Sequence, residues 1–128
     1  MVADQGITAY TYSPLGGGLL TGKYAVGGAG RLTEDSRYAA RYGRSEMAVA
    51  AEGLARLAAE LGTHPAMLAV AWAKCHPAGP VPLISARNAE QLAPSLAAAD
   101  YPMTAETYAR IAALYPAPPP ATDRTEEA

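Results

Sequence analysis

The segment from Tyr12 to Tyr24 constrains the fold more than any other part of the chain. It reads Tyr-Ser-Pro-Leu-Gly-Gly-Gly-Leu-Leu-Thr-Gly-Lys-Tyr and follows a run, residues 7–12, that is rich in the β-branched and aromatic residues typical of strands. Pro14 ends the strand, because proline has no N–H to donate to a neighbouring strand. The consecutive glycines allow the backbone to take positive φ angles and to approach a ligand closely. The segment therefore predicts a strand that opens into a ligand-holding loop, with Lys23 placed to meet an anion.

Length and composition limit the remaining possibilities. A chain of 128 residues suffices for one domain with its own core, but a complete (β/α)8 barrel typically needs about 250 residues. Half of the residues are hydrophobic and 17% are charged, which indicates a globular protein. The net charge of −2 gives no reason to expect nucleic acid or an anionic membrane as a partner. The single cysteine, Cys75, excludes an internal disulfide and a Cys-x-x-Cys metal pair.

The chain shows no targeting or membrane signal that we can identify. It has no apolar run of about 18 residues, and its first residues lack the basic start and apolar stretch of a signal peptide. We therefore expect a cytoplasmic location and no membrane partner. The sequence also shows no clustered metal ligands, so no metal site is expected.

Periodicity and capping signals predict mainly helices between two strands. Residues 81–84 form the second predicted strand, and residues 25–32 are predicted to be a loop. Helices are expected to begin at the N-caps Asp35, Ser45, Thr63, Asn88 and Thr104. On the third of these helices, Leu68, Ala71, Trp72 and Cys75 recur at the spacing of a buried stripe. The order strand, helical crossover, strand, helix predicts a parallel α/β unit.

The second predicted strand leads into another segment with chemical potential. Ser85 and Arg87 precede the helix capped by Asn88, whose first turn offers unpaired N–H groups and the positive end of a dipole. The planar fork of Arg87 suits a phosphate, although an exposed arginine at a helix start is the alternative reading. Half of the basic residues also lie within the 22 positions from Lys23 to Arg44. They form either a solvated helix face or, chiefly through Lys23 and Arg31, a site for phosphates.

Taken together, the two segments resemble the aldo-keto reductases. In that family a Ser-Pro-Leu segment ending in Leu-Thr-Gly-Lys-Tyr follows the seventh strand of the barrel, and a segment like residues 82–92 follows the eighth. Their order and their spacing of roughly sixty residues also fit. The resemblance covers about residues 5–116 and implies an α/β fold that is a C-terminal fragment of a (β/α)8 TIM barrel, with two parallel strands and several helices. Residues 1–116 would form the C-terminal part of an NADP-dependent oxidoreductase domain, and residues 117–128 a disordered tail.

The resemblance also implies a cofactor, NADP(H), and a set of residues that would bind it. Tyr12 would stack on the nicotinamide, the loop that ends at Lys23 would wrap the pyrophosphate, and Arg87 would meet the 2′-phosphate. The alternatives are a core tyrosine at position 12 and a merely flexible glycine turn. The family's usual Gln-Leu-Glu-Glu-Asn is replaced here by Gln91-Leu92-Ala93-Pro94-Ser95, so that adenine contacts fall to Gln91 and Ser95. The predicted binding residues are Tyr12, Ser13, Pro14, Leu15, Gly17, Gly18, Leu20, Gly22, Lys23, Arg31, Ser85, Arg87, Gln91 and Ser95.

Catalysis is not expected from this chain alone. The family's catalytic Asp, Tyr, Lys and His belong to earlier strands and loops that have no match here, and His64 and His76 stand at helix ends where neither can replace them. The chain is therefore expected to be a truncated or partial reductase, a half-barrel that needs an N-terminal partner, or a non-catalytic nucleotide-binding module. NADPH is the expected ligand, and a carbonyl substrate is expected only if an N-terminal half completes the site. Open strand edges also predict self-association.

Overall fold

The computed structural model describes residues 4–117 and contains two short parallel strands, β1 (Tyr10–Thr11) and β2 (Val81–Pro82). Tyr10 lies opposite Val81. The N–H of Val81 donates to the carbonyl of Ala9 at 2.8 Å, and the N–H of Leu83 donates to that of Thr11 at 2.7 Å. Two parallel strands among helices confirm the predicted fold class. The strands are shorter than predicted, because each has only one neighbour within the described chain and the ladder between them is short.

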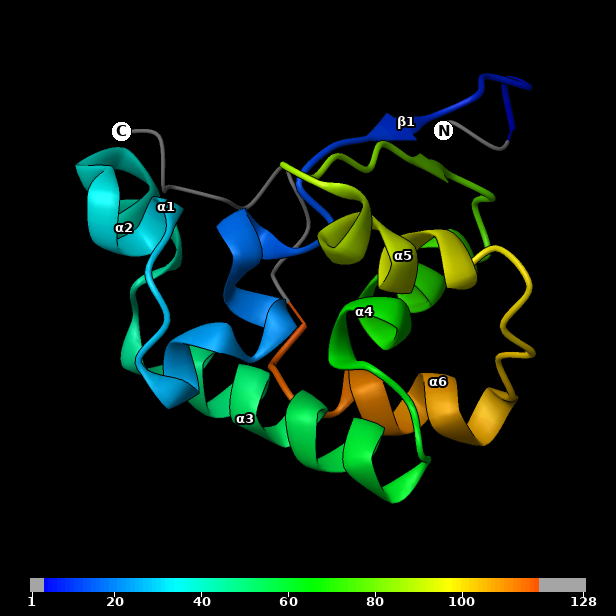
Figure 1. Ribbon diagram of the computed structural model, residues 1–128. Coiled ribbons are helices and arrows are strands. Elements are labelled where there is room, and N and C mark those ends of the chain that lie inside the picture. The colour runs from blue at the N-terminus through cyan, green and yellow to red at the C-terminus, as the bar shows by residue number, and fades with distance from the viewer. Residues whose placement is uncertain (1–3, 118–128) are drawn as a thin grey trace.

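Helices make up most of the described chain (Figure 1). The loop after β1 contains two 3-10 turns, η1 and η2, and two short helices, α1 and α2, so the predicted loop over residues 25–32 is only partly correct. Four longer helices follow. The bounds are η1 Gly16–Thr21, η2 Lys23–Val26, α1 Arg31–Glu34, α2 Ser36–Tyr42, α3 Ser45–Glu60, α4 Pro65–Lys74, α5 Ala89–Ala97 and α6 Ala105–Ala112.

Three of the predicted helix caps are confirmed. The side chains of Asp35, Asn88 and Thr104 accept backbone N–H groups in the first turns of α2, α5 and α6. The predicted caps Ser45 and Thr63 are wrong by one residue. Ser45 is already helical, so α3 begins after Arg44, and the N-cap of α4 is His64, whose Nδ1 accepts the N–H of Ala66 at 3.1 Å.

The main core lies where α3, α4 and α6 meet (Figure 1). Leu54, Leu57, Leu68 and Ile111 are buried together, and Leu68 is fully buried. Leu68 and Ala71 confirm the predicted stripe on α4, and Trp72 is partly buried with its ring stacked 5.5 Å from that of Tyr108. Cys75 is exposed, contrary to the prediction, because α4 ends at Lys74 and the chain turns there.

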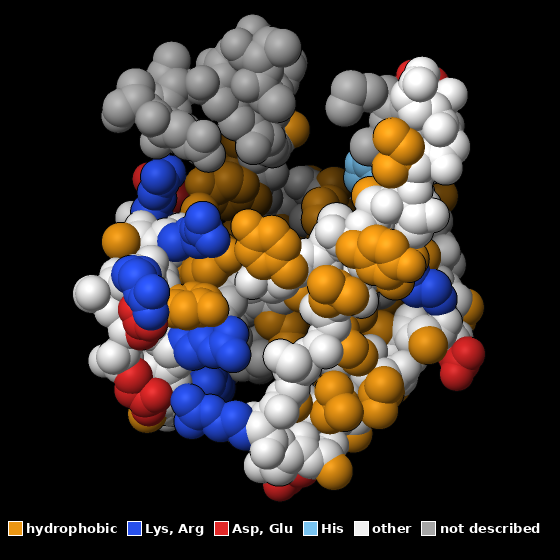
Figure 2. All heavy atoms as spheres, turned by 90° about the horizontal axis from the view of Figure 1, so that it is seen from above, with side chains coloured by type: hydrophobic (Ala, Val, Ile, Leu, Met, Phe, Trp, Pro, Cys, Tyr) orange, Lys and Arg blue, Asp and Glu red, His pale blue; other side chains and the backbone are white. Residues whose placement is uncertain are grey.

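The two faces of the sheet differ sharply. Ile84 packs against Val70 and Ala71 of α4, which covers one face. The opposite face carries Tyr10, Tyr12, Val81 and Leu83, whose exposed fractions range from 42% to 72%. In Figure 2 apolar side chains spread over much of this side of the molecule, while basic side chains gather beside a hollow. Exposed aromatic and aliphatic side chains in such numbers mark a surface suited to contact with further protein.

The predicted disordered tail lies outside the described residues, apart from Ala117.

Candidate functional site

A groove of about 920 Å³ lies where the two strands end. One wall comes from the segment after β1, and the other from the segment after β2 and the first turn of α5. The carboxyl ends of neighbouring parallel strands lie at the same edge of a sheet, which is where α/β proteins place their ligand sites. The volume lies within the range of known ligand pockets.

Internal hydrogen bonds hold the glycine loop in one shape. Gly17 has a φ of 65° and Gly18 a φ of 93°, a region that favours glycine. The hydroxyl of Thr21 donates to the carbonyl of Gly18 at 2.7 Å. The hydroxyl of Tyr24 donates to the carbonyl of Gly17 and accepts the N–H of Leu32, both at 3.2 Å. The loop therefore forms a wall of defined shape. The sequence alone had left a flexible glycine turn as an alternative.

Glycines also determine where Lys23 lies. A Cβ at Gly18 would approach the Cε of Lys23 to 3.2 Å, and a Cβ at Gly30 would lie only 2.2 Å from its Nζ. The lysine side chain is thus seated between two glycines, with its Nζ 4.8 Å from the centre of the Tyr24 ring. Within residues 4–117 no carboxylate forms an ion pair with this ammonium group. The seat leaves the charge of Lys23 available to an anion in the groove.

Arg31 adds a second cation to the same wall. Its guanidinium carbon lies 5.2 Å from the ring centre of Tyr38, and its Nη1 donates to the Tyr38 hydroxyl at 3.2 Å. The part of the chain that the structure describes contains no ion pair for Arg31 either. Tyr42 chiefly, and Tyr12 to a smaller extent, raise the pKa of Arg41 through hydrogen bonding and charge. Tyr12 itself is 72% exposed and lines the cavity rather than the core.

The third cation comes from the opposite wall. Arg87 lines the groove after β2, and its Nη2 lies 3.4 Å from the Oε2 of Glu34 in α1. Next to it, the side chain of Asn88 accepts the N–H of Gln91 at 2.9 Å and so begins α5. Ser85, Asn88 and Gln91 also line the cavity. Cations from both walls therefore surround one volume, an arrangement that suits a ligand with several phosphates.

The structure brings most of the predicted binding residues together. The residues at the groove are Tyr12, Ser13, Pro14, Leu15, Gly17, Gly18, Lys23, Arg31, Ser85, Arg87 and Gln91. Three others lie elsewhere. Leu20 packs against the main core, Gly22 lines a separate pocket, and Ser95 is buried at 4% exposure on α5. Pro94 lies within α5 as predicted, and the turn of the helix takes Ser95 away from the groove side.

Some residues that line the groove were not among the predicted binding residues. His64 and Ala66 reach the groove from the start of α4, and Ala29 and Glu90 line it as well. The cap position of His64 directly before Pro65 is the signal that places it at a helix start, but no local pattern shows that this start faces the glycine loop. Among the described residues, no group of three His, Cys, Asp or Glu side chains is arranged to hold a metal ion.

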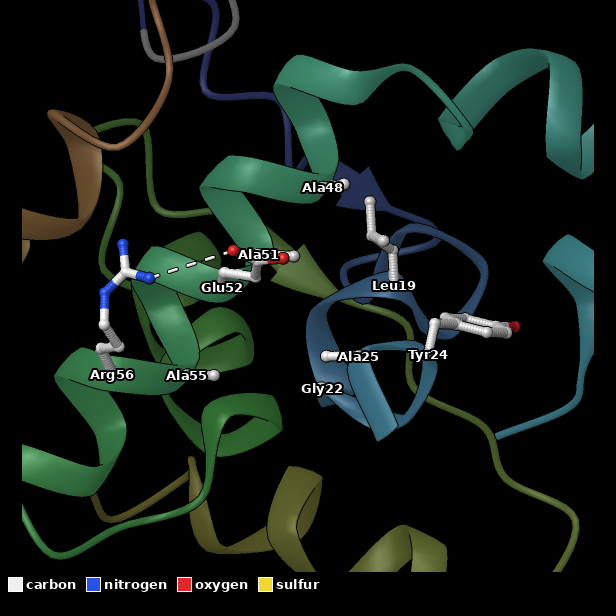
Figure 3. Close-up of a pocket in the computed structure, with 9 residues that line it drawn as sticks. All are labelled: Leu19, Gly22, Tyr24, Ala25, Ala48, Ala51, Glu52, Ala55 and Arg56. Carbon is white, nitrogen blue, oxygen red and sulfur yellow. Dashed lines mark ion pairs between the residues drawn. The ribbon is translucent and has the colours of Figure 1, made fainter. Parts of the chain in front are cut away.

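A second, smaller pocket of about 370 Å³ lies between α3 and the 3-10 turns η1 and η2 (Figure 3). Ala48, Ala51 and Ala55 of α3 line it together with Leu19 and the ring of Tyr24. The charged residues of its described lining are Glu52 and Arg56, which lie 4.0 Å apart and pair with each other. This pocket is apolar and has no free cation along its described lining, so it does not suit a phosphate.

Comparisons with known proteins indicate one family. A sequence model described as the Aldo/keto reductase family matches residues 1–116. "Uncharacterized oxidoreductase YrpG" of Bacillus subtilis (strain 168) is 30% identical over 115 residues, which are 90% of this chain and 34% of that protein. "Probable voltage-gated potassium channel subunit beta" of Oryza sativa subsp. japonica is 30% identical over 133 aligned positions, covering 96% of this chain and 40% of that protein. The chain thus spans between a third and two fifths of the length of these relatives.

Within residues 4–117, no helix is long and apolar enough to cross a membrane.

Proposed function

Because the chain belongs to the aldo/keto reductase family, we propose that it binds NADP(H) in the groove at the strand ends. The supporting observation is that Lys23, Arg31 and Arg87 line a single cavity of about 920 Å³ from two segments far apart in the sequence. Three cations suit the three phosphates of this dinucleotide. The exposed ring of Tyr12 at the same groove offers a flat face on which a nicotinamide can stack.

In a complete reductase, NADPH supplies the hydride that converts an aldehyde or ketone into an alcohol. We propose that this chain provides the cofactor-binding part of such an enzyme and performs no turnover by itself. Its own residues would bind and orient the dinucleotide. The glycine loop would approach the pyrophosphate closely, Lys23 would neutralise it, and Arg87 would distinguish NADPH from NADH through the 2′-phosphate.

Titration of the full chain with NADPH and NADH tests this function. Trp72 and the tyrosines supply the fluorescence signal, and we expect tighter binding of NADPH. A charged hydrogen bond contributes about 1.5–3 kcal/mol, so loss of the 2′-phosphate contact should weaken binding roughly 10- to 100-fold. Arg87→Met should therefore remove most of the preference. Arg56→Met is the matched control, because both arginine side chains are 73% exposed and both pair with a glutamate. Equal affinity for NADPH and NADH would refute the proposed role of Arg87.

The exposed face of the sheet favours a related alternative, a half-barrel that works with a separate N-terminal part. Tyr10, Val81 and Leu83 leave an apolar surface that further strands would cover. Supplying the N-terminal half of a family member in trans should then produce carbonyl reduction coupled to NADPH oxidation. Without a partner, the same face is expected to cause self-association, which sedimentation analysis would detect.

The similarity to a protein named as a channel subunit favours a second candidate, a non-catalytic nucleotide-binding module. This function also uses the groove and also predicts saturable NADPH binding. It differs in predicting no turnover even when an N-terminal half is supplied and binds. Measuring NADPH oxidation with an aldehyde substrate in the reconstituted pair separates the two.

A further inference from the structure

Glu34 forms an ion pair with Arg87, one of the cations that line the groove. It lies in α1, three residues after Arg31, and its backbone N–H donates to the carbonyl of Gly30 at 2.9 Å. The same short helix therefore positions both Arg31 and Glu34. The carboxylate of Glu34 reaches Arg87, 53 positions further along the chain, and so joins the two walls of the groove.

The contact between these side chains is weak by comparison with another ion pair in the chain. Arg87 and Glu34 share one contact of 3.4 Å, and their side chains are 73% and 53% exposed. Arg110 and Glu60, in contrast, form two hydrogen bonds of 2.9 and 2.6 Å. A single long contact between exposed groups is exchangeable, because solvent screens it and the fork geometry is only half used.

We propose that Glu34 is a specificity-determining residue that competes with a phosphate monoester for Arg87, an inference that rests on the proposed function. Its carboxylate pairs with the guanidinium of Arg87 when the groove holds no ligand, and this pair must break when a phosphate binds Arg87. A phosphate dianion presents more charge and more acceptor oxygens than a carboxylate, so it displaces Glu34. A nucleotide without the additional phosphate does not displace it. Glu34 thus reduces the apparent affinity for every ligand of Arg87 by the fraction of time that the pair is formed.

Replacement of the carboxylate provides the test. Exposed ion pairs are weak, so Glu34→Gln should tighten binding of 2′,5′-ADP about two- to fivefold. Binding of 5′-AMP, which differs only in lacking the 2′-phosphate, should change less. Glu52→Gln is the control, because Glu52 is 57% exposed and pairs with Arg56 at 4.0 Å away from the groove. It should leave both affinities unchanged. Calorimetric titration of the full chain measures all of these constants.

A double-mutant cycle shows whether the effect passes through Arg87. In an Arg87→Met background, Glu34→Gln should bring no gain. Weaker binding of 2′,5′-ADP by Glu34→Gln would overturn the inference and identify the pair as a clasp that closes over the bound ligand. An unchanged affinity would overturn it as well, while a retained preference of the wild type for 2′,5′-ADP over 5′-AMP would leave the proposed function standing. Equal wild-type affinities for the two nucleotides would overturn both claims.

Discussion

A single methyl group at Gly17 should disturb the wall of the groove. Its φ of 65° is in the left-handed region, where a side chain costs about 1–2 kcal/mol. A Cβ there would also lie 2.7 Å from Cδ1 of Tyr38 and 3.0 Å from Cδ1 of Leu32. Displacing these packed side chains adds about 1–3 kcal/mol. We therefore expect Gly17→Ala to lower the free energy of unfolding by about 2–5 kcal/mol in all.

The matched control separates the backbone cost from the steric cost. Gly62 has a φ of 64°, and a Cβ there would meet nothing within 4 Å. Gly62→Ala should therefore lose only the backbone contribution of about 1–2 kcal/mol. Urea unfolding, followed by circular dichroism, measures both variants, and NADPH titration should show weaker binding for Gly17→Ala alone. Equal destabilisation by the two substitutions would refute the close packing of Tyr38 and Leu32 against Gly17.

Three further predictions concern the scaffold. Leu68→Ala should lower the free energy of unfolding by about 2–5 kcal/mol, because Leu68 is fully buried in the core; a loss below about 1 kcal/mol in urea unfolding would contradict this packing. Asn88→Ala should cost about 0.5–2 kcal/mol by removing the cap of α5, measured by thermal unfolding, with Asn88→Asp as the variant that retains it. The hydrogen bond from Arg110 lowers the pKa of Glu60 from its ordinary value of 4.5, so this pair stabilises the fold above that value and loses its effect as the pH falls below it. The difference in unfolding free energy between wild type and Glu60→Gln should accordingly shrink between about pH 6 and pH 3, and a difference that grows on acidification would contradict the pairing.

The sequence predicted those features that depend on neighbours along the chain. Asn88 and Thr104 cap helices because each bond reaches only three residues ahead, and Leu68 is buried because its spacing follows the helix period. Lys23 and Arg87 were likewise predicted to lie in one site because each belongs to a segment that follows a strand, and both line the groove. The capping of α4 was misassigned because Thr63 and His64 are adjacent and either can accept an N–H.

Features that depend on distant parts of the chain were not predictable in this way. The position of the Lys23 side chain depends on the absence of a side chain at Gly30, and no sequence pattern between the two residues indicates this contact. The pair of Glu34 with Arg87 joins segments 53 positions apart. Cys75 fits the buried stripe by spacing, yet it is exposed because α4 ends one residue earlier. Each of these depends on where segments meet in space, which periodicity does not encode.

The most direct test of the central claim is to map where NADPH binds. Amide chemical shifts of the full isotope-labelled chain, followed by NMR during NADPH titration, report each position separately. The account predicts the largest shifts at Gly17, Gly18, Lys23, Arg31 and Arg87, with little change along the apolar pocket at Ala51 and Ala55. Shifts concentrated at that apolar pocket, or none during a titration in which the chain stays folded, would contradict the claim that the groove at the strand ends is the cofactor site.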